Sequence, residues 1–235
     1  MDMSCLPNST RHPFLVARSL VKKYGARTAL DHVDFAVGNG EVIAVMGRCG
    51  AGKTTLVRVL TGILQPDHGA VLLDGHRLDH LGEARRNAVR CQEFGLIAQD
   101  GALIDELTVE ENVALPLVLR GSDRDEALVA AREWLDHLEL RRIQRQYPDV
   151  LSAAHGQFVT VARALVGHPK MVFADDPTDA LGNRAAGEVV EALLRSAARA
   201  GAAVVVTTRC KEVAAHAQRS IEIRDGRFVG GVLME

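Results

Sequence analysis

The sequence has no apolar run long enough to form a membrane-spanning helix. Its longest strong run, residues 202–206, falls far short of the ~18–20 residues that cross a bilayer. Residues 1–10 contain neither a basic start nor an apolar stretch, so we expect no signal peptide there. We instead expect residues 1–12 to form a disordered tail. If the protein works at a membrane, another chain must supply the membrane-embedded part.

Cysteine and net charge are also scarce. The four cysteines lack the short C-x-x-C spacing of zinc and redox sites, which favours reduced thiols in a cytosolic protein; they are Cys5, Cys49, Cys91 and Cys210. The formal net charge is −2 and there is no long basic run, which disfavours a nucleic-acid-binding surface. The 235 residues are 47% hydrophobic and 25% charged. This composition supports a full core, in one large domain or a domain with a sub-lobe, and argues against disorder.

Patterns typical of strands and of helices alternate along the chain, which predicts an α/β fold with a largely parallel sheet. The clearest buried strands are short and mostly aliphatic, as expected for a sheet covered on both faces: residues 42–46, 171–174 and 203–206. The early region favours antiparallel strands, with a turn signal at Asp74-Gly75; these strands are predicted at residues 14–19, 32–37 and 70–73. A late Asp225-Gly226 predicts a hairpin between residues 221–224 and 227–229.

The middle third of the chain favours helices. Thr108 and Glu111 form a capping box before a predicted helix over residues 109–119, which Pro116 is expected to kink. Apolar residues then recur at helical spacing: Leu128, Ala131, Leu135 and Leu138. We interpret residues 100–158 as a helical sub-lobe inserted into a core formed by residues 13–99 and 159–235.

The most specific motif is a phosphate-binding loop. Residues 47–55 fit GxxxxGK(S/T), and they follow a buried strand that ends at Met46. An amphipathic helix is predicted to begin at Lys53 and to carry Leu56, Val59, Leu60 and Ile63. Glycines let the backbone amides point at phosphate oxygens, and the helix adds the positive end of its dipole. The predicted ATP contacts are Gly47, Arg48, Cys49, Gly50, Ala51, Gly52, Lys53, Thr54 and Thr55. Among them, Lys53 should reach the β- and γ-phosphates and Thr54 should bind Mg²⁺. A chance glycine-rich turn is the alternative, and the strand–loop–helix context argues against it.

A second acidic motif follows another apolar strand. The strand delivers Asp175 to the carboxyl edge of the sheet, where ligands of such folds bind. We expect Asp175 to hold Mg²⁺ from its second coordination shell and Asp176 to face the attacking water. Because Pro177 follows, a helix N-cap is the alternative role for these aspartates.

The segments between the two motifs resemble those of ATP-binding-cassette (ABC) ATPases, over nearly the whole chain from about residue 14. Residues 147–152, 161–165 and 174–181 resemble the family's signature-to-acidic stretch, residues 23–25 its aromatic A-loop and residues 95–99 its Q-loop. Residues 107–117 are similar to the group that exports lipoproteins, macrolides or antimicrobial peptides, and to the cell-division ATPase of that group. The resemblance implies a P-loop NTPase fold with a RecA-like core, an antiparallel β subdomain and an inserted α-helical subdomain.

The resemblance also implies roles for individual residues. Tyr24 would stack on adenine, since an aromatic face tolerates a base without hydrogen-bond demands; the alternative is a core or rim tyrosine. Gln99 would touch Mg²⁺ or the water and link nucleotide state to the helical lobe; the alternative is an ordinary glutamine at a strand end. Two domains of the family pair head to tail, so that each ATP lies between one P-loop and the opposing signature, here Ser152, Ala153, Ala154 and His155.

Two departures from the family pattern affect catalytic positions. Asp176 stands where the family has glutamate, and its shorter side chain leaves it at risk of missing the 2.6–3.2 Å reach of a base. Arg209 stands where the family has the histidine that senses the γ-phosphate. An arginine either still contacts phosphate or points to solvent, and in neither case can it shuttle a proton.

Two further departures affect the contact between paired domains. Ala153 and Ala154 replace glycines, which adds methyl groups near phosphate at a place where alanine resists a positive φ, and His155 is either a hydrogen-bond donor or a surface histidine. In the loop that communicates across the dimer, Gly182 replaces aspartate and Asp179 replaces a small residue. The catalytic and the signature defects lie on the same chain. A heterodimer with an intact partner would therefore carry one defect in each ATP site, a homodimer would carry all of them twice, and pairing rescues them incompletely in either case.

We therefore predict an ATP-binding ATPase subunit that couples ATP–Mg²⁺ to a separate transmembrane permease on the inner face of the cell membrane, paired with a second nucleotide-binding domain. The altered residues predict slow or absent turnover. Loss of a base or of a charge-stabilising group lowers the rate by ~10²–10⁴-fold. A second hypothesis is a regulatory module whose ATP occupancy only sets a conformation. A soluble P-loop kinase is a third, and residues 147–165 argue against it.

Overall fold

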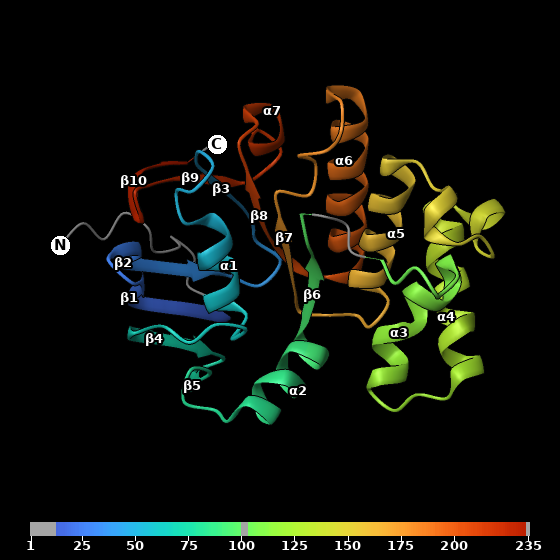
Figure 1. The fold of residues 1–235 in the computed structure, drawn as a ribbon, viewed down its shortest axis with the longest axis horizontal. Coiled ribbons are helices and arrows are strands. Elements are labelled where there is room, and N and C mark those ends of the chain that lie inside the picture. The colour runs from blue at the N-terminus through green and yellow to red at the C-terminus, as the bar shows by residue number, and fades with distance from the viewer. Residues whose placement is uncertain (1–12, 100–102, 234–235) are drawn as a thin grey trace.

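Two β-sheets with flanking helices make up residues 13–99 and 103–233, the part of the chain that this computed structural model describes (Figure 1). The tail predicted for residues 1–12 lies outside the described residues. The larger sheet has six strands and the smaller has four. The α/β prediction is confirmed.

The six-stranded sheet is almost entirely parallel. Its order is β10 (Arg227–Leu233), β9 (Arg219–Arg224), β3 (Val42–Met46), β8 (Ala203–Thr208), β7 (Met171–Asp175) and β6 (Phe94–Ile97). The strands from β9 to β6 pair in parallel, and β10 pairs antiparallel with β9. Asp225 and Gly226 adopt φ values of 48° and 77°, which are the left-handed conformations that a two-residue hairpin turn needs. The predicted hairpin is confirmed.

The four-stranded sheet is antiparallel, as the early region predicted. Its order is β2 (Arg27–Val37), β1 (Leu15–Tyr24), β4 (His68–Leu73) and β5 (His76–Arg77). The first two strands are longer than predicted, so Tyr24 is the last residue of β1 and sits beside the tight turn to β2. This extension carries Tyr24 and Arg27 toward the loop that follows β3.

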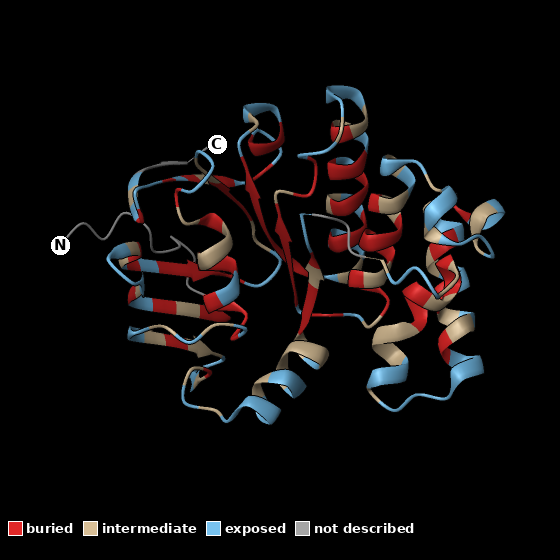
Figure 2. Ribbon diagram, in the orientation of Figure 1, coloured by how far each residue is buried: buried red, intermediate tan, exposed pale blue. Residues whose placement is uncertain are grey.

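Alternate residues of the central strands enter two different cores. Ile43 and Val45 of β3 pack with the antiparallel sheet and α1 (Lys53–Leu60), whereas Ala44 packs with α5 (Ala153–Leu165), α6 (Asn183–Ala200) and α7 (Lys211–Ala214). Successive side chains of a strand point to opposite faces, so a sheet covered on both sides must be apolar throughout. Figure 2 shows this burial along β3, β7 and β8.

One predicted helix residue was wrong. Ile63 lies beyond the end of α1 and its side chain is 50% exposed. The helix ends at Leu60, with Thr61 as its C-cap, because Gly62 follows with a φ of 66°, a left-handed residue that closes the helix and turns the chain away. Leu56, Val59 and Leu60 are buried as expected.

Helices fill the middle of the chain. The described helices there are α2 (Glu83–Glu93), α3 (Val109–Leu119), α4 (Arg124–His137) and two short 3₁₀ turns, Arg141–Ile143 and Pro148–Val150. The capping box is present: Thr108 accepts from the amide of Glu111, whose carboxylate accepts from the amide of Thr108. The amide and the hydroxyl of Thr108 both donate to the Glu111 carboxylate, and these hydrogen bonds, joined by one from Arg124, lower the pKa of Glu111. Pro116 lies inside α3, and the helix continues to Leu119. Among the described residues, no helix is both long and apolar enough to cross a membrane.

Candidate functional site: a phosphate-binding cleft

The loop between β3 and α1 accepts glycine alone at two points. A Cβ on Gly47 would lie 2.6 Å from the carbonyl oxygen of Ile223, and one on Gly52 would lie 2.4 Å from that of Ala29. Gly52 also has a φ of 114°, which L-residues rarely adopt. The loop is therefore held tightly between β9 and β2, and its path is fixed before any ligand arrives.

Lys53 begins α1 and turns back into this loop. Its side chain is 5% exposed, and Nζ donates to the carbonyl oxygens of Gly47 at 2.9 Å and Arg48 at 3.3 Å. The carboxylate of Asp176 lies 3.1 Å from the same nitrogen. A buried ammonium needs such partners, because an unpaired charge of this kind is costly to desolvate. The cation is thus held at the N-terminus of α1, where the helix dipole adds further positive potential.

Asp175 and Asp176 stand side by side at the carboxyl end of β7, and Thr207 of β8 fixes both. The hydroxyl of Thr207 donates to Asp175 Oδ1 at 2.7 Å, and the backbone amide of Asp176 donates to the hydroxyl oxygen at 2.9 Å. Asp176 has a φ of 43°, a conformation that aspartate tolerates better than most residues. The N-cap alternative is wrong for both residues, because the next helix, α6, begins only at Asn183.

Three side chains that follow the carboxyl ends of β8, β7 and β6 contact one another near the acidic pair. Arg209 follows β8, Asp179 follows β7, and Gln99 follows β6. Arg209 forms an ion pair with Asp179 Oδ1, and the Gln99 amide donates to Asp179 Oδ2 at 3.0 Å. Arg209 is 51% exposed, yet it lies at the cleft and not in open solvent.

The loop, the acidic pair and these strand ends enclose a cavity of about 270 Å³. Most of the predicted site residues line it: Tyr24, Cys49, Gly50, Gly52, Lys53, Thr54, Thr55, Gln99, Asp176 and Arg209. Gly47, Arg48, Ala51 and Asp175 do not line it. Arg27 and Ala29, which belong to no sequence motif, also line the cavity, as does Asp179, which the sequence marks only as a departure from the family pattern. Arg27 donates to the carbonyl oxygen of Gly50 at 2.5 Å, so its guanidinium stabilises the phosphate-binding loop.

Two of the four predicted signature residues, Ser152 and Ala153, line a second cavity of about 440 Å³, whereas Ala154 and His155 do not. Ser152, Ala153 and Gly156 line it, and Gln99 and Asp179 line both cavities. Ser152 is the N-cap of α5 and accepts from the amide of His155 at 3.2 Å. The expected strain at Ala153 and Ala154 is wrong, because both lie in the first turn of α5, where no positive φ is required.

Comparisons with known proteins identify the family. A profile described as ABC transporter matches residues 30–179, and the lipoprotein-releasing system ATP-binding protein LolD of Bordetella avium is 38% identical over 86% of this chain and 88% of that protein. The chain belongs to the ABC transporter family. Among solved structures, the ATP-binding cassette MJ0796, a dimer bound to ADP and Pi, matches with a TM-score of 0.86 and 30% identity over 94% of this chain and 99% of that one.

A second relative has a different organisation. The macrolide export ATP-binding/permease protein MacB 1/2 of Paracoccus denitrificans is 37% identical over 94% of this chain, but the match spans only 33% of that longer protein. The resemblance to the lipoprotein and macrolide exporter group is thereby confirmed. The ABC transporter chain described here is an ATP-binding subunit of the ABC ATPase type, as its sequence predicted.

Proposed function

We propose that this subunit binds ATP–Mg²⁺ in the cleft above α1 and couples its binding and hydrolysis to a separate transmembrane permease. The observation that carries the proposal is the buried Lys53 ammonium, held at a glycine-shaped loop and facing a carboxylate from the neighbouring strand. Such a loop and lysine, placed between a buried strand and a helix, recognise phosphates. Tyr24, 49% exposed beside the loop, provides a face for the adenine.

The oxygen donors around the loop suit magnesium. Thr54, Asp175 and Gln99 supply a hydroxyl, a carboxylate and an amide oxygen, which are the hard ligands that Mg²⁺ prefers. Among the described residues, no group of three or more His, Cys, Asp and Glu side chains could hold a metal alone. Magnesium in such a site depends on nucleotide phosphates and water for the remaining ligands, which fits binding as a complex with ATP.

Hydrolysis is assigned to the residues at the carboxyl ends of β6, β7 and β8. Asp176 is the proposed base for the attacking water, and Gln99 and Arg209 contact the water or the terminal phosphate. Ser152, Ala153, Ala154 and His155 would face the ATP of a second nucleotide-binding domain. In support, Ser152 and Ala153 line a cavity apart from the phosphate loop of their own chain. We further propose that residues 13–99 and 159–235 act as the core, and residues 100–158 as the sub-lobe.

A groove between α2, β6 and α3 is the proposed contact for the permease, which would place the subunit on the inner face of the membrane. The groove encloses about 380 Å³, and Leu119 at its edge is 70% exposed, the most of any large apolar side chain described. Strand β6 forms part of its wall and leads, two residues later, to Gln99 at the ATP cleft. A short cytoplasmic helix of the permease with an apolar face would fit this groove. Changes at the ATP cleft would be transmitted to that helix through β6.

Isothermal titration with Mg²⁺–ATP tests the cleft. Lys53→Met should abolish uptake, whereas the control Lys170→Met should not, because Lys170 precedes β7 at the opposite end of the sheet and pairs with Glu93. Equal affinity of wild type and Lys53→Met would refute the assignment.

The permease contact is tested in membranes that contain the partner permease. Leu119→Glu should reduce permease-stimulated ATPase without changing the basal rate. The control Val129→Glu, at a 53% exposed position on α4 outside the groove, should leave both rates unchanged. Normal stimulation of Leu119→Glu would exclude the groove as the contact.

A further inference from the structure

Asp179 joins two residues that face the ATP cleft. One of its carboxylate oxygens pairs with Arg209 and the other accepts from Gln99 at 3.0 Å, so a single side chain bridges the ends of β8 and β6. Its own position is fixed by a turn in which the Asp179 amide donates to the Asp176 carbonyl oxygen at 3.2 Å. The Asp179 carboxylate therefore has a fixed position in the wall of the cleft, unlike a charged side chain that is free in solvent.

The bridge lies where a bound nucleotide would contact it. Asp179, Arg209 and Gln99 all line the cavity that holds Lys53 and Asp176. Asp179 and Gln99 also line the cavity beside the signature, so the bridge forms a wall shared by both. Any group that enters the space between Lys53 and Arg209 meets the charge of Asp179 as well.

The bridge also sets the charge available to a phosphate. Lys53, Arg27 and Arg209 contribute cations to the cavity, while Asp176 and Asp179 contribute anions. Asp179 Oδ1 pairs with Nη2 of the Arg209 guanidinium, so a phosphate that binds this nitrogen has to replace the carboxylate. A terminal phosphate must displace Asp179 from Arg209, and it must do so against the repulsion of that carboxylate.

We propose that Asp179 is a positioning residue that competes with the terminal phosphate of ATP for Arg209, and so lowers the preference of the cleft for ATP over ADP. The inference rests on the proposed ATP site. It differs from a structural role for Asp179 in one respect: the effect depends on the third phosphate. ADP, which lacks that phosphate, does not require Arg209 to be released.

A double-mutant cycle isolates this competition. In wild type, Arg209→Ala should change the affinity for ATP less than about threefold, because the arginine is already occupied. In an Asp179→Ala background Arg209 is free, and its removal should weaken ATP binding by about tenfold or more, as expected for a charge-assisted hydrogen bond. Asp179→Ala alone should tighten ATP binding. Affinity for ADP should change less than about threefold throughout.

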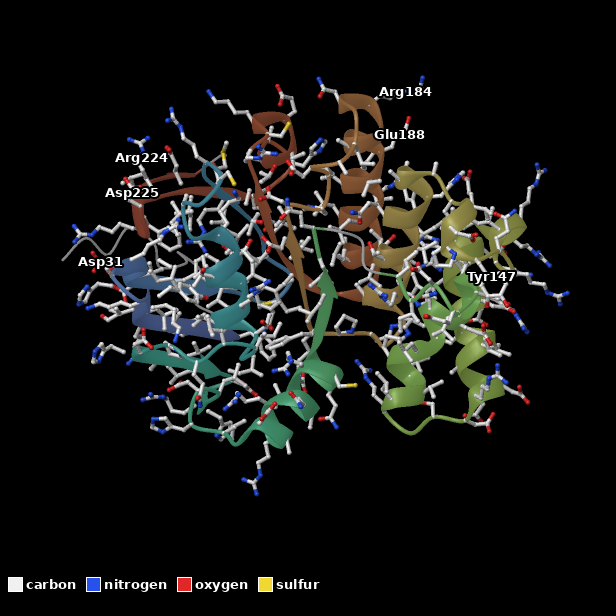
Figure 3. All side chains as sticks on the ribbon, in the orientation of Figure 1. Asp31, Tyr147, Arg184, Glu188, Arg224 and Asp225 are labelled. Carbon is white, nitrogen blue, oxygen red and sulfur yellow. The ribbon has the colours of Figure 1, made fainter. Side chains whose placement is uncertain are left out.

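The experiment is isothermal titration of the four proteins with Mg²⁺–ATP and Mg²⁺–ADP, with thermal unfolding of each. Asp179→Asn joins the set because it keeps the size of the side chain and removes the charge, and it should behave as Asp179→Ala does. The controls are Glu188→Ala and Arg184→Ala, which break an ion pair at the exposed end of α6 (Figure 3).

The outcomes separate the two proposals. An equal effect of Arg209→Ala in both backgrounds, or equal changes for ATP and ADP, would overturn the competition while leaving the ATP site intact. If folded wild-type protein took up neither nucleotide, the ATP site itself would be wrong, and the competition with it.

Discussion

Lengthening one side chain should speed ATP hydrolysis. Asp176 is the proposed base, and it stands where the family resemblance implies a glutamate. Its carboxylate lies 3.1 Å from Lys53 Nζ, deep in the cleft, because Thr207 holds its backbone amide against β8. Asp176→Glu extends the reach of the carboxylate by one C–C bond, about 1.5 Å, without changing its charge.

The size of the effect follows from that distance. A base works at about 2.6–3.2 Å from its proton, and a misplacement of about 1 Å costs roughly 10²-fold in rate. We therefore expect Asp176→Glu to raise the single-turnover rate about 10²-fold, which equals about 2.7 kcal/mol of activation free energy. Because residue 176 has a φ of 43°, glutamate there costs roughly 1 kcal/mol more than aspartate, and the melting temperature should fall by about 2–4 °C.

The assay is single-turnover hydrolysis of Mg²⁺–ATP with the protein in excess. Asp176→Asn is the matched control, since it keeps the length and removes the charge, and its rate should fall by at least about 10²-fold. If Asp176→Glu left the rate within twofold of wild type or lowered it while Asp176→Asn was strongly impaired, aspartate would already stand at working distance. Side-chain length would then not limit the rate, and the prediction of slow turnover would be wrong.

Two further predictions concern stability. Gly52→Ala should lower the free energy of unfolding by about 3 kcal/mol, measured by urea denaturation, because its Cβ would lie 2.4 Å from the Ala29 carbonyl oxygen at a φ of 114°; an unchanged midpoint would contradict the strained loop. The pKa of Glu111 is lowered by its hydrogen bonds from Thr108. Its ionised form therefore stabilises the fold at pH values above its ordinary pKa of 4.5, and this stability is lost as the pH falls through the lowered pKa of the folded state. The difference in melting temperature between wild type and Glu111→Gln should therefore be constant at neutral pH and shrink in acid; a difference that grew in acid would reverse the sign.

The phosphate loop could be predicted from sequence because its determinants are local. The strand, the glycines and the helix of residues 42–60 are contiguous, and each has its own pattern: a short aliphatic run, small residues at fixed spacing and apolar residues on one helical face. Asp175 was equally accessible, since a buried strand delivers it to the sheet edge. The same local reasoning located the capping box at Thr108 to within a residue.

What the sequence did not reveal depends on strands that pair far apart in the chain. Thr207 orients Asp175 only because β8 pairs with β7 in parallel, and Arg27 reaches Gly50 only because β2 begins beside the loop. Neither residue belongs to a motif, and their separation from the site in sequence is large. Ile63 failed for a different reason: apolar periodicity continued past Thr61, and the left-handed Gly62 overrode it.

The unusual residues at Asp179 and Arg209 also need to be judged as a pair. In the sequence, Asp179 and Arg209 are two separate departures from the family pattern. In the folded protein they form one ion pair. Reverting Arg209→His alone would replace a permanent cation with an imidazole that is mostly neutral at pH 7 and would leave the carboxylate beside the terminal phosphate. Reverting Asp179→Ser as well removes that repulsion. We therefore expect the single histidine variant to hydrolyse ATP more slowly than the double variant. Equal rates for the two variants would mean that the carboxylate has no influence on the phosphate.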